Sequence, residues 1–311
     1  MSILIDIRMS NWMTDQALKK KLIPLLPDVE IHCGPPEQVL ADVTMLATNR
    51  LFPGVAEKLP NLQLIQKLGA GVETMMRDTS LPDRVRVARL EPKIQADEIA
   101  EYCLAEVLAY LRNIRGYQRD QQNRLWAEQE PRRAAETSVG VLGLGHIGKD
   151  VANGFVKNGF EVFGWSRNQK TLEGVSCHVG DDGLNRVLAK SDFVVSVLPS
   201  TEATRGFADA LFFKKMKSNS VFINVGRGDL VVDLDLINAL NAGRLSGATL
   251  DVLNNEPLDD EHPFWLHEKI AITPHVSGWS LGDGILDVAE NYNRLIAGKP
   301  LLREIDRKLG Y

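Results

Sequence analysis

The chain has 311 residues, a hydrophobic fraction of 44% and a formal net charge of −5 at pH 7. A chain of this length exceeds one comfortable hydrophobic core, so we expect two domains. The mildly acidic balance and the absence of a run of Lys or Arg argue against a nucleic acid or an anionic membrane surface as partner, and no stretch approaches the ~18 apolar residues of a membrane span.

Short apolar stretches alternate with helical or turn-rich stretches in the first 95 residues. We expect strands at residues 3–7, 29–32, 43–47, 62–68 and 85–90. Strands that alternate with helices form a parallel sheet covered on both faces. A glycine-rich turn, LGAGV at residues 68–72, follows the fourth strand, at the edge where open α/β folds bind ligands. The same residues fit equally well an ordinary tight turn into the next helix.

A long helix is predicted from Ala96, with apolar residues on one face and Gly116 at its end. A helix of this length between two sheet domains predicts a crossing, so we place the domain boundary near Gln95. The polar segment at residues 117–136 contains Trp126 among charged residues. Trp126 either packs against its own domain or anchors a partner subunit, because aromatic residues are enriched in the cores of interfaces.

Residues 137–149 (TSVGVLGLGHIGK) have the pattern of a strand, a tight turn and a helix. The glycines fit three steric demands: Gly143 lets the chain turn off the strand, Gly145 lets a pyrophosphate approach the backbone, and Gly148 lets helix and strand pack closely. The anion would bind at the helix N-terminus, where unpaired N–H groups and the helix dipole favour negative charge. A strand at residues 161–165 completes a βαβ unit, so the segment predicts a dinucleotide site rather than an ordinary turn.

The rest of the second half continues the same alternation. We expect further strands at residues 193–198, 221–225, 248–252 and 270–273, a final helix after Gly282, and a tail at residues 301–311 that packs back on the first domain. The predicted fold is therefore α/β, with two doubly wound parallel-sheet (Rossmann-like) domains. Residues 1–95 and 283–311 would form a substrate-binding domain, and residues 96–282 a dinucleotide-binding domain. A chain that leaves a domain and returns crosses twice, which predicts a hinged cleft.

Polar residues follow three strands of the second domain, at the sheet edge that would face a nucleotide. Arg227 lies between two glycines, and its planar fork matches a carboxylate in two hydrogen bonds. His275 can exchange a proton with a carbonyl or hydroxyl oxygen, and Glu256 could fix its tautomer and stabilise its cation. Each residue alone fits an ordinary surface position, and only their joint placement predicts a site.

The end of the strand at residues 161–165 decides which dinucleotide would bind. NAD-binding versions of this unit place an acid there for the ribose 2′-hydroxyl, and that acid would repel a 2′-phosphate. This chain has Ser166 and Arg167 instead, with Lys170 nearby. A hydroxyl and one or two cations favour the 2′-phosphate of NADPH, the alternative being a solvated arginine in a polar turn.

Cys33, Cys103 and Cys177 are far apart, odd in number and without C-x-x-C spacing. They predict neither a disulfide framework nor a zinc site, and we expect no metal. This cysteine usage fits a reducing compartment, so we expect a cytoplasmic location.

Taken together, these motifs resemble those of the D-isomer-specific 2-hydroxyacid dehydrogenases. The resemblance covers almost the whole chain and rests on GLGHIG at residues 143–148, NVGRG at 224–228, LDVLNNEPL at 250–258 and TPH at 273–275. The short form and the WSR turn at 165–167 make the chain most similar to the NADPH-dependent glyoxylate/hydroxypyruvate reductases of that family. The resemblance implies an oxidoreductase that reduces a small 2-oxo acid with NADPH, or less efficiently with NADH, and we expect a homodimer.

The resemblance also implies residue roles. His275 would be the general acid, Glu256 its orienting partner, and Arg227 the ligand of the 2-oxo acid, whose carboxylate would bind the backbone of Ala70 and Gly71. The cofactor-binding residues implied by the motifs and the resemblance are Gly143, Gly145, His146, Ile147, Gly148, Ser166, Arg167, Leu198, Pro199, Thr204, Val225, Gly226 and Asp251.

Two departures and several alternatives remain at this point. Leu253 stands where an aromatic residue is common in the family, and residues 277–279 (SGW) also differ, which affects the choice of substrate more than the reaction.

A dinucleotide-sensing binding protein, of the kind seen in related transcriptional co-repressors, would share the scaffold, but the three catalytic residue types and the absence of extra tails disfavour it. Glu256 disfavours a formate-dehydrogenase-like activity, because that branch has an amide there. Phosphoglycerate oxidation stays open, although the chain has no room for the regulatory domain that many such enzymes carry.

Overall fold

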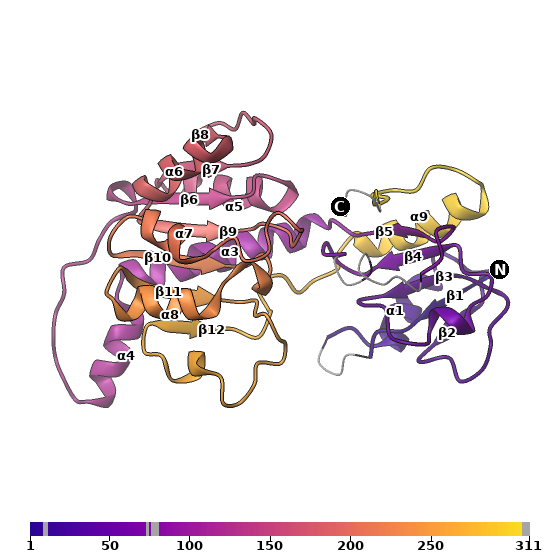
Figure 1. Cartoon of the computed structure of the whole chain (residues 1–311). Helices are drawn as coiled ribbons and strands as arrows, with labels where there is room; N and C mark the ends of the chain where they lie inside the picture. The colour runs from indigo at the N-terminus through magenta and orange to yellow at the C-terminus, as the bar shows by residue number, and fades with distance from the viewer. Residues whose placement is uncertain (9–11, 73–74, 76–80, 307–311) are drawn as a thin grey trace. The chain divides into compact units, whose positions relative to one another are not determined.

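The structure is a computed structural model that describes residues 1–8, 12–72, 75 and 81–306 (Figure 1). The chain divides into two compact units, one formed by Met1–Gln95 with Trp279–Tyr311 and the other by Ala96–Gly278. No helix in the described ranges has the length and apolar character needed to cross a membrane.

The first unit contains a five-stranded parallel sheet with the strand order β2-β1-β3-β4-β5. Its elements are β1 (Ser2–Ile5), α1 (Asp15–Leu22), β2 (Ile31–Cys33), β3 (Val43–Thr48), η1 (Ala56–Lys58), β4 (Leu64–Lys67), β5 (Arg86–Ala88) and α9 (Gly284–Ile296). Successive residues of β1 face opposite sides, as the two-residue strand period requires. Ile3 and Ile5 pack with residues of α1 and α9, whereas Leu4 packs in the cluster on the other face. Both faces of the sheet are therefore covered.

The chain returns to the first unit at Trp279, four residues before the predicted boundary at 283. Two contacts explain this correction. The Trp279 carbonyl accepts a hydrogen bond from Trp12 Nε1 at 2.7 Å, and Leu281 is buried in the core that α9 helps to form. Leu301 and Ile305 of the predicted tail are also buried in this unit, whereas residues 307–311 lie outside the described part of the chain.

The predicted long helix is two helices, α3 (Lys93–Leu111) and α4 (Ile114–Gln122), so Gly116 does not end it. Asn113 interrupts the helix with the left-handed φ of 50°. Gly116 lies inside α4, where a Cβ would meet the Asn113 side chain at 2.1 Å. The glycine therefore leaves room for the Asn113 side chain beside the first turn of α4.

The second unit contains a seven-stranded parallel sheet with the order β12-β11-β10-β9-β6-β7-β8. Its strands are β6 (Ser138–Leu142), β7 (Glu161–Trp165), β8 (Val175–His178), β9 (Phe193–Ser196), β10 (Ser220–Asn224), β11 (Leu245–Leu250) and β12 (Ile270–Ile272). The other elements are η2 (Ala134–Glu136), α5 (His146–Lys157), α6 (Gly180–Lys190), α7 (Ala210–Lys215), η3 (Gly228–Leu230), α8 (Asp233–Asn241) and η4 (Pro263–Leu266). The sequence did not predict β8, a short edge strand with no fully buried residue.

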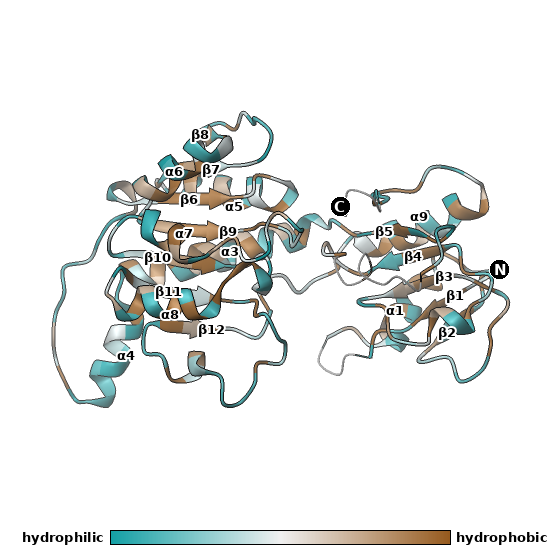
Figure 2. Ribbon diagram, in the orientation of Figure 1, coloured by the Kyte–Doolittle hydropathy of each residue, from teal (hydrophilic) through white to brown (hydrophobic). Residues whose placement is uncertain are grey.

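Helices cover both faces of this sheet. One face packs with α6, α7 and α8 and the other with α3 and α5. Figure 2 shows mostly hydrophobic strands in this sheet and helices that mix hydrophilic and hydrophobic residues. The strand order reverses at β6, which pairs with β7 on one side and β9 on the other. Open parallel sheets bind ligands beyond the carboxyl ends of the strands at such a reversal. The predicted α/β class with two parallel sheets is confirmed.

Candidate functional site

The glycine-rich turn joins β6 to α5 at the point where the strand order reverses. Gly143 has a φ of 97°, in the left-handed region that favours glycine. A Cβ on Gly148 would lie 1.6 Å from the Gly143 carbonyl oxygen, so only glycine lets the helix start against this turn. A Cβ on Gly145 would meet nothing within 4 Å, so it would stand in the open space in front of the helix. The placements of Gly143 and Gly148 match two of the predicted steric demands, whereas the demand at Gly145 concerns a bound pyrophosphate and stays a prediction.

The N-terminus of α5 is suited to an anion. Gly145 is the N-cap, and in the described structure no side chain caps this helix and no acid occupies its first turn. By contrast, the side chains of Thr14 and Asp209 cap α1 and α7. The first-turn N–H groups, including those of His146 and Ile147, are left for an external acceptor such as a pyrophosphate. The residues present therefore fit a dinucleotide.

The ends of β9 and β10 lie next to this turn. A Cβ on Gly143 would lie 3.2 Å from Leu198 Cδ2, and a Cβ on Gly226 would lie 2.5 Å from the Leu198 carbonyl oxygen. The Thr204 hydroxyl donates to the Pro199 carbonyl at 2.6 Å, which fixes the loop that follows β9. The structure thus brings predicted cofactor residues from the loops after three strands to one sheet edge, with Val225 in the same segment as Gly226.

The end of β7 carries the residues predicted to choose the dinucleotide. Ser166 is buried, its N–H donates to the His178 carbonyl at 3.1 Å, and its hydroxyl donates to the Asn168 carbonyl at 2.8 Å. The serine therefore shapes the turn, and its hydroxyl oxygen can still accept a hydrogen bond. Arg167 and Lys170 are exposed. The turn presents cations and no acid at the position where a 2′-phosphate would lie.

Arg227 follows β10 on a turn that glycine makes possible. A Cβ on Gly228 would lie 1.9 Å from the Leu253 carbonyl carbon, so the Arg227 turn packs directly against the loop after β11. The buried Asn224 side chain holds the turn, because its Oδ1 accepts from the Gly226 N–H at 3.2 Å and its Nδ2 donates to the Arg227 carbonyl at 2.8 Å. The arginine and the loop that carries Glu256 are thereby brought together.

His275 and Glu256 form the predicted pair. His275 Nδ1 lies 2.8 Å from Glu256 Oε2, and Glu256 Oε1 accepts from the Leu253 N–H at 2.9 Å. The side chains are 49% and 37% exposed, respectively. With Nδ1 bonded to the carboxylate, Nε2 is the ring nitrogen that can exchange a proton with a ligand.

The surroundings keep Glu256 ionised. Burial disfavours its charged form, but the hydrogen bond and charge of His275, the Leu253 N–H and the charge of Arg227 outweigh burial and lower the pKa of Glu256. A carboxylate with a lowered pKa stabilises the fold above its ordinary pKa of about 4.3, and this contribution is lost as the pH falls through the lowered value.

Glu256→Gln tests this ionisation. At neutral pH we expect kcat to fall by about 10- to 100-fold, because His275 loses its charged partner. This loss should be smaller than the loss caused by removing His275, the expected general acid. The wild type should also have a higher melting temperature than the variant at neutral pH, and the difference should shrink as the pH falls through the lowered pKa of Glu256. Thermal unfolding across this pH range measures it, and a pH-independent difference would contradict the assignment.

Hydrogen bonds of Asp251, Thr273 and Tyr102 hold the turn that carries His275, a role that the sequence did not predict for these residues. Asp251, expected at the cofactor, is 1% exposed and accepts hydrogen bonds from Thr273 Oγ1 at 2.6 Å and from the Val276 and Ser277 N–H groups, both at 2.9 Å. Tyr102 of α3 in turn places its hydroxyl 2.7 Å from Thr273 Oγ1. The only sequence signal was a tyrosine within an apolar helix pattern.

Ala70 and Gly71 follow β4 in the first unit, whereas Arg227, Glu256 and His275 belong to the second. Ala70 and Gly71 are half-buried. They come after Gly69, whose carbonyl oxygen accepts a hydrogen bond from the Leu90 N–H at 3.1 Å.

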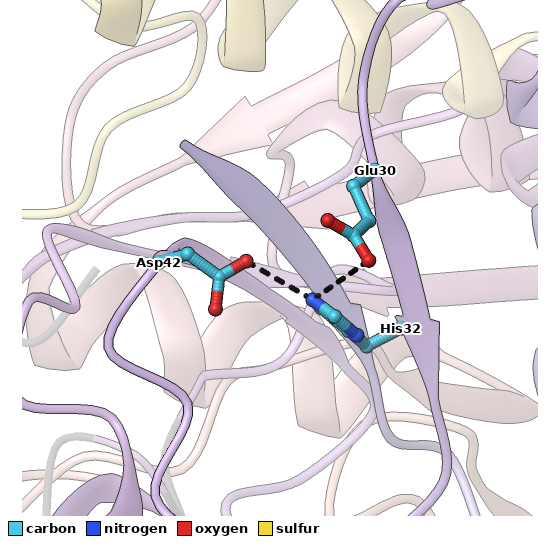
Figure 3. Close-up of side chains that lie close together, drawn as sticks. All are labelled: Glu30, His32 and Asp42. Atoms are coloured by element: carbon cyan, nitrogen blue, oxygen red, sulfur yellow. Dashed lines mark hydrogen bonds and ion pairs between the residues drawn. The ribbon is translucent and has the colours of Figure 1, made fainter.

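Glu30, His32 and Asp42 form a separate cluster in the first unit, near the amino ends of β2 and β3 (Figure 3). One ligand atom from each lies within 4.8 Å of the others, a geometry that a metal ion could use. Hydrogen bonds account for the arrangement: Asp42 Oδ2 accepts from the Ser2 hydroxyl at 2.6 Å and lies 3.1 Å from His32 Nε2. These two contacts, the Ser2 bond first, lower the pKa of Asp42 to about 2. These contacts pair neighbouring segments of the first unit.

Comparisons with known proteins give a matching family and similar chains. The family described as "D-isomer specific 2-hydroxyacid dehydrogenase, NAD binding domain" matches residues 104–277. A glyoxylate/hydroxypyruvate reductase A of Photorhabdus laumondii is 38% identical over 250 residues, which cover 78% of this chain and 80% of the relative.

Solved structures extend the likeness to the whole chain. A D-isomer specific 2-hydroxyacid dehydrogenase from Xanthobacter autotrophicus, in complex with NADPH and MES, has a TM-score of 0.92 at 34% identity and covers 100% of this chain and 99% of its own. An NADPH-dependent glyoxylate/hydroxypyruvate reductase from Sinorhizobium meliloti, in complex with NADP and sulfate, has a TM-score of 0.91 at 30% identity with the same coverage.

Proposed function

The chain belongs to the D-isomer specific 2-hydroxyacid dehydrogenase family, and we propose that it reduces a short 2-oxo acid, such as glyoxylate or hydroxypyruvate, with NADPH. The observation that carries the proposal is the contact of 2.8 Å between His275 Nδ1 and Glu256 Oε2, on a sheet edge that also presents Arg227. The names of the similar proteins, which are reductases of these acids or NADPH complexes, support the same reaction.

The cofactor would bind along the carboxyl edge of the second sheet. The N–H groups of His146 and Ile147 would hold the pyrophosphate, the residues after β7 the 2′-phosphate, and the loops after β9, β10 and β11 the nicotinamide half. Bound there, NADPH supplies a hydride to the carbonyl carbon of the acid. The assignments for this half are Leu198, Pro199, Thr204, Val225, Gly226 and Asp251.

The protein's own residues would supply the proton and hold the substrate. As the carbonyl carbon gains the hydride, its oxygen gains negative charge, and the protonated His275 would donate the Nε2 proton to that oxygen. Glu256 would stabilise the protonated ring before the transfer and hold Nδ1–H of the neutral ring afterwards. Arg227 would bind the carboxylate in two hydrogen bonds, which a lysine could not reproduce. By resemblance, the backbone of Ala70 and Gly71 would also bind this carboxylate.

Initial rates of NADPH oxidation with a panel of 2-oxo acids test the proposal. We expect glyoxylate and hydroxypyruvate to give the highest kcat/KM. Turnover of a phosphorylated 2-oxo acid in their place would make the chain a phosphoglycerate-type dehydrogenase. Tight NADPH binding without turnover of any acid would make it a dinucleotide sensor instead.

We also propose that the chain forms a homodimer that buries Trp126. This side chain is 88% exposed, so it does not pack against its own unit, and the neighbouring Leu125 is exposed too. Its indole N–H donates to Glu128 within the same polar segment. Exposed aromatic side chains of this kind are typical anchors of interfaces.

Sedimentation equilibrium tests the dimer. We expect a dimer for the wild type and a weakened one for Trp126→Ala. Trp265→Ala is the control, since Trp265 is also exposed but lies on η4. A wild-type monomer, or equal dissociation of both variants, would contradict the proposal.

All three cysteines are free thiols, which supports the expected cytoplasmic location.

A further inference from the structure

We propose that Tyr102 is a positioning residue of this site, acting on His275 through the hydroxyl of Thr273 and the buried carboxylate of Asp251. The inference deepens the proposed reductase function and rests on it for its kinetic test. All four residues belong to the second unit. Tyr102 contacts neither Glu256 nor the His275 ring in this scheme, so it would act only through the turn that holds the histidine.

A directed chain of hydrogen bonds runs from α3 to Asp251. The Tyr102 hydroxyl lies 2.7 Å from Thr273 Oγ1, and Thr273 Oγ1 donates to Asp251 Oδ1 at 2.6 Å. A threonine hydroxyl has a single proton. Because Thr273 gives that proton to the carboxylate, Tyr102 must be the donor in the first bond. The tyrosine thereby fixes the rotamer of Thr273 and the direction of its O–H.

Asp251 connects this chain to His275. Its side-chain oxygens accept from the Val276 and Ser277 N–H groups, and its carbonyl accepts from the His275 N–H, each at 2.9 Å. His275 has a φ of 57°, a left-handed conformation that a residue other than glycine keeps only where its surroundings hold it. Asp251 is buried, so water does not readily replace a lost donor. The network therefore fixes the backbone from which the imidazole reaches Glu256.

Tyr110 provides a matched comparison on the same helix. Its hydroxyl donates to the Ala248 carbonyl at 3.2 Å, within β11 rather than at the strand end. Burial raises the pKa of both tyrosine hydroxyls, so both are protonated donors at neutral pH. Removing either hydroxyl deletes hydrogen bonding between α3 and the sheet, but only Tyr102 leads to the turn of His275.

The kinetic test compares Tyr102→Phe with Tyr110→Phe. We expect Tyr102→Phe to lower kcat for glyoxylate by about 3- to 10-fold, the effect of one lost hydrogen bond on the barrier. The KM for glyoxylate and the Kd for NADPH should stay near those of the wild type, and Tyr110→Phe should keep the wild-type kcat. Thr273→Val should match Tyr102→Phe, and the double variant should be no slower than Thr273→Val alone, because both changes interrupt one chain.

A second measurement does not depend on turnover. In ¹⁵N-histidine-labelled protein, with the signals of His275 identified by their absence in His275→Ala, we expect these signals to shift in Tyr102→Phe and Thr273→Val but not in Tyr110→Phe. Unshifted His275 signals in Tyr102→Phe, or equal kcat in the two phenylalanine variants, would overturn the proposal. A wild type that reduces no 2-oxo acid would refute the reductase function, while the NMR comparison would still decide the role of Tyr102.

Discussion

Replacement of His275 by alanine is expected to lower kcat for glyoxylate reduction by about 10²- to 10⁴-fold, the usual cost of removing a positioned general acid. Hydride addition leaves negative charge on the substrate oxygen. His275, whose Nδ1 lies 2.8 Å from Glu256, is placed to neutralise that charge from Nε2. The Kd for NADPH should change little, since the α5 turn and the loops after β7 and β9 would hold most of the cofactor. Steady-state kinetics with a fluorescence titration of NADPH separates the two effects.

His267→Ala is the matched control for this prediction. His267 is another histidine of the second unit with a polar side-chain partner, its Nε2 lying 3.3 Å from Asn241 Oδ1. It precedes β12, whereas His275 follows it. We expect the control to keep the wild-type kcat. Near wild-type turnover in His275→Ala would show that another group delivers the proton.

The second large effect concerns the choice between NADPH and NADH. A charge-assisted contact contributes ~1.5 to 3 kcal/mol, and each ~1.4 kcal/mol is a factor of ten. If Arg167 binds the 2′-phosphate, the wild type should therefore prefer NADPH by roughly 10- to 100-fold in kcat/KM. Arg167→Ala should remove most of that preference. Ser166→Asp should reverse it, because a carboxylate repels the phosphate and accepts from the ribose 2′-hydroxyl.

Arg132→Ala serves as the charge-matched control. Arg132 pairs with Asp192, which precedes β9 and therefore lies at the amino edge of the sheet. The variant loses the same charge as Arg167→Ala and should keep the preference for NADPH. Equal kcat/KM for the two cofactors in the wild type, or equal loss of preference in both arginine variants, would show that Arg167 does not bind the phosphate.

Most of the fold could be predicted because its signals are local. Apolar strands alternating with helical segments indicate a parallel sheet, and the residues of both cores follow that alternation. The errors have local causes as well. The edge strand β8 lacks a buried apolar run, Asn113 interrupts the long helix without a Pro or Gly signal, and the return at Trp279 depends on a contact with Trp12.

The candidate site divides in the same way. Gly143, Gly148 and the pair of His275 with Glu256 could be predicted, because turn chemistry and residue type mark them. The contact between Tyr102 and Thr273 joins residues 171 positions apart, so no spacing in the sequence indicates it. Asp251 was predicted at the cofactor, but the periodicity of a strand could not show that its carboxylate holds the His275 turn.

The most direct test of the central claim follows the hydride itself. Wild-type enzyme is incubated with glyoxylate and NADPH that carries deuterium at both positions of the nicotinamide C4, and the product is analysed by mass spectrometry. The account predicts glycolate with one deuterium on its C2 carbon, formed in step with NADPH oxidation. In His275→Ala, glycolate formation and NADPH oxidation should slow together by the factor expected for kcat. Glycolate without deuterium, or NADPH oxidation without glycolate, would contradict it.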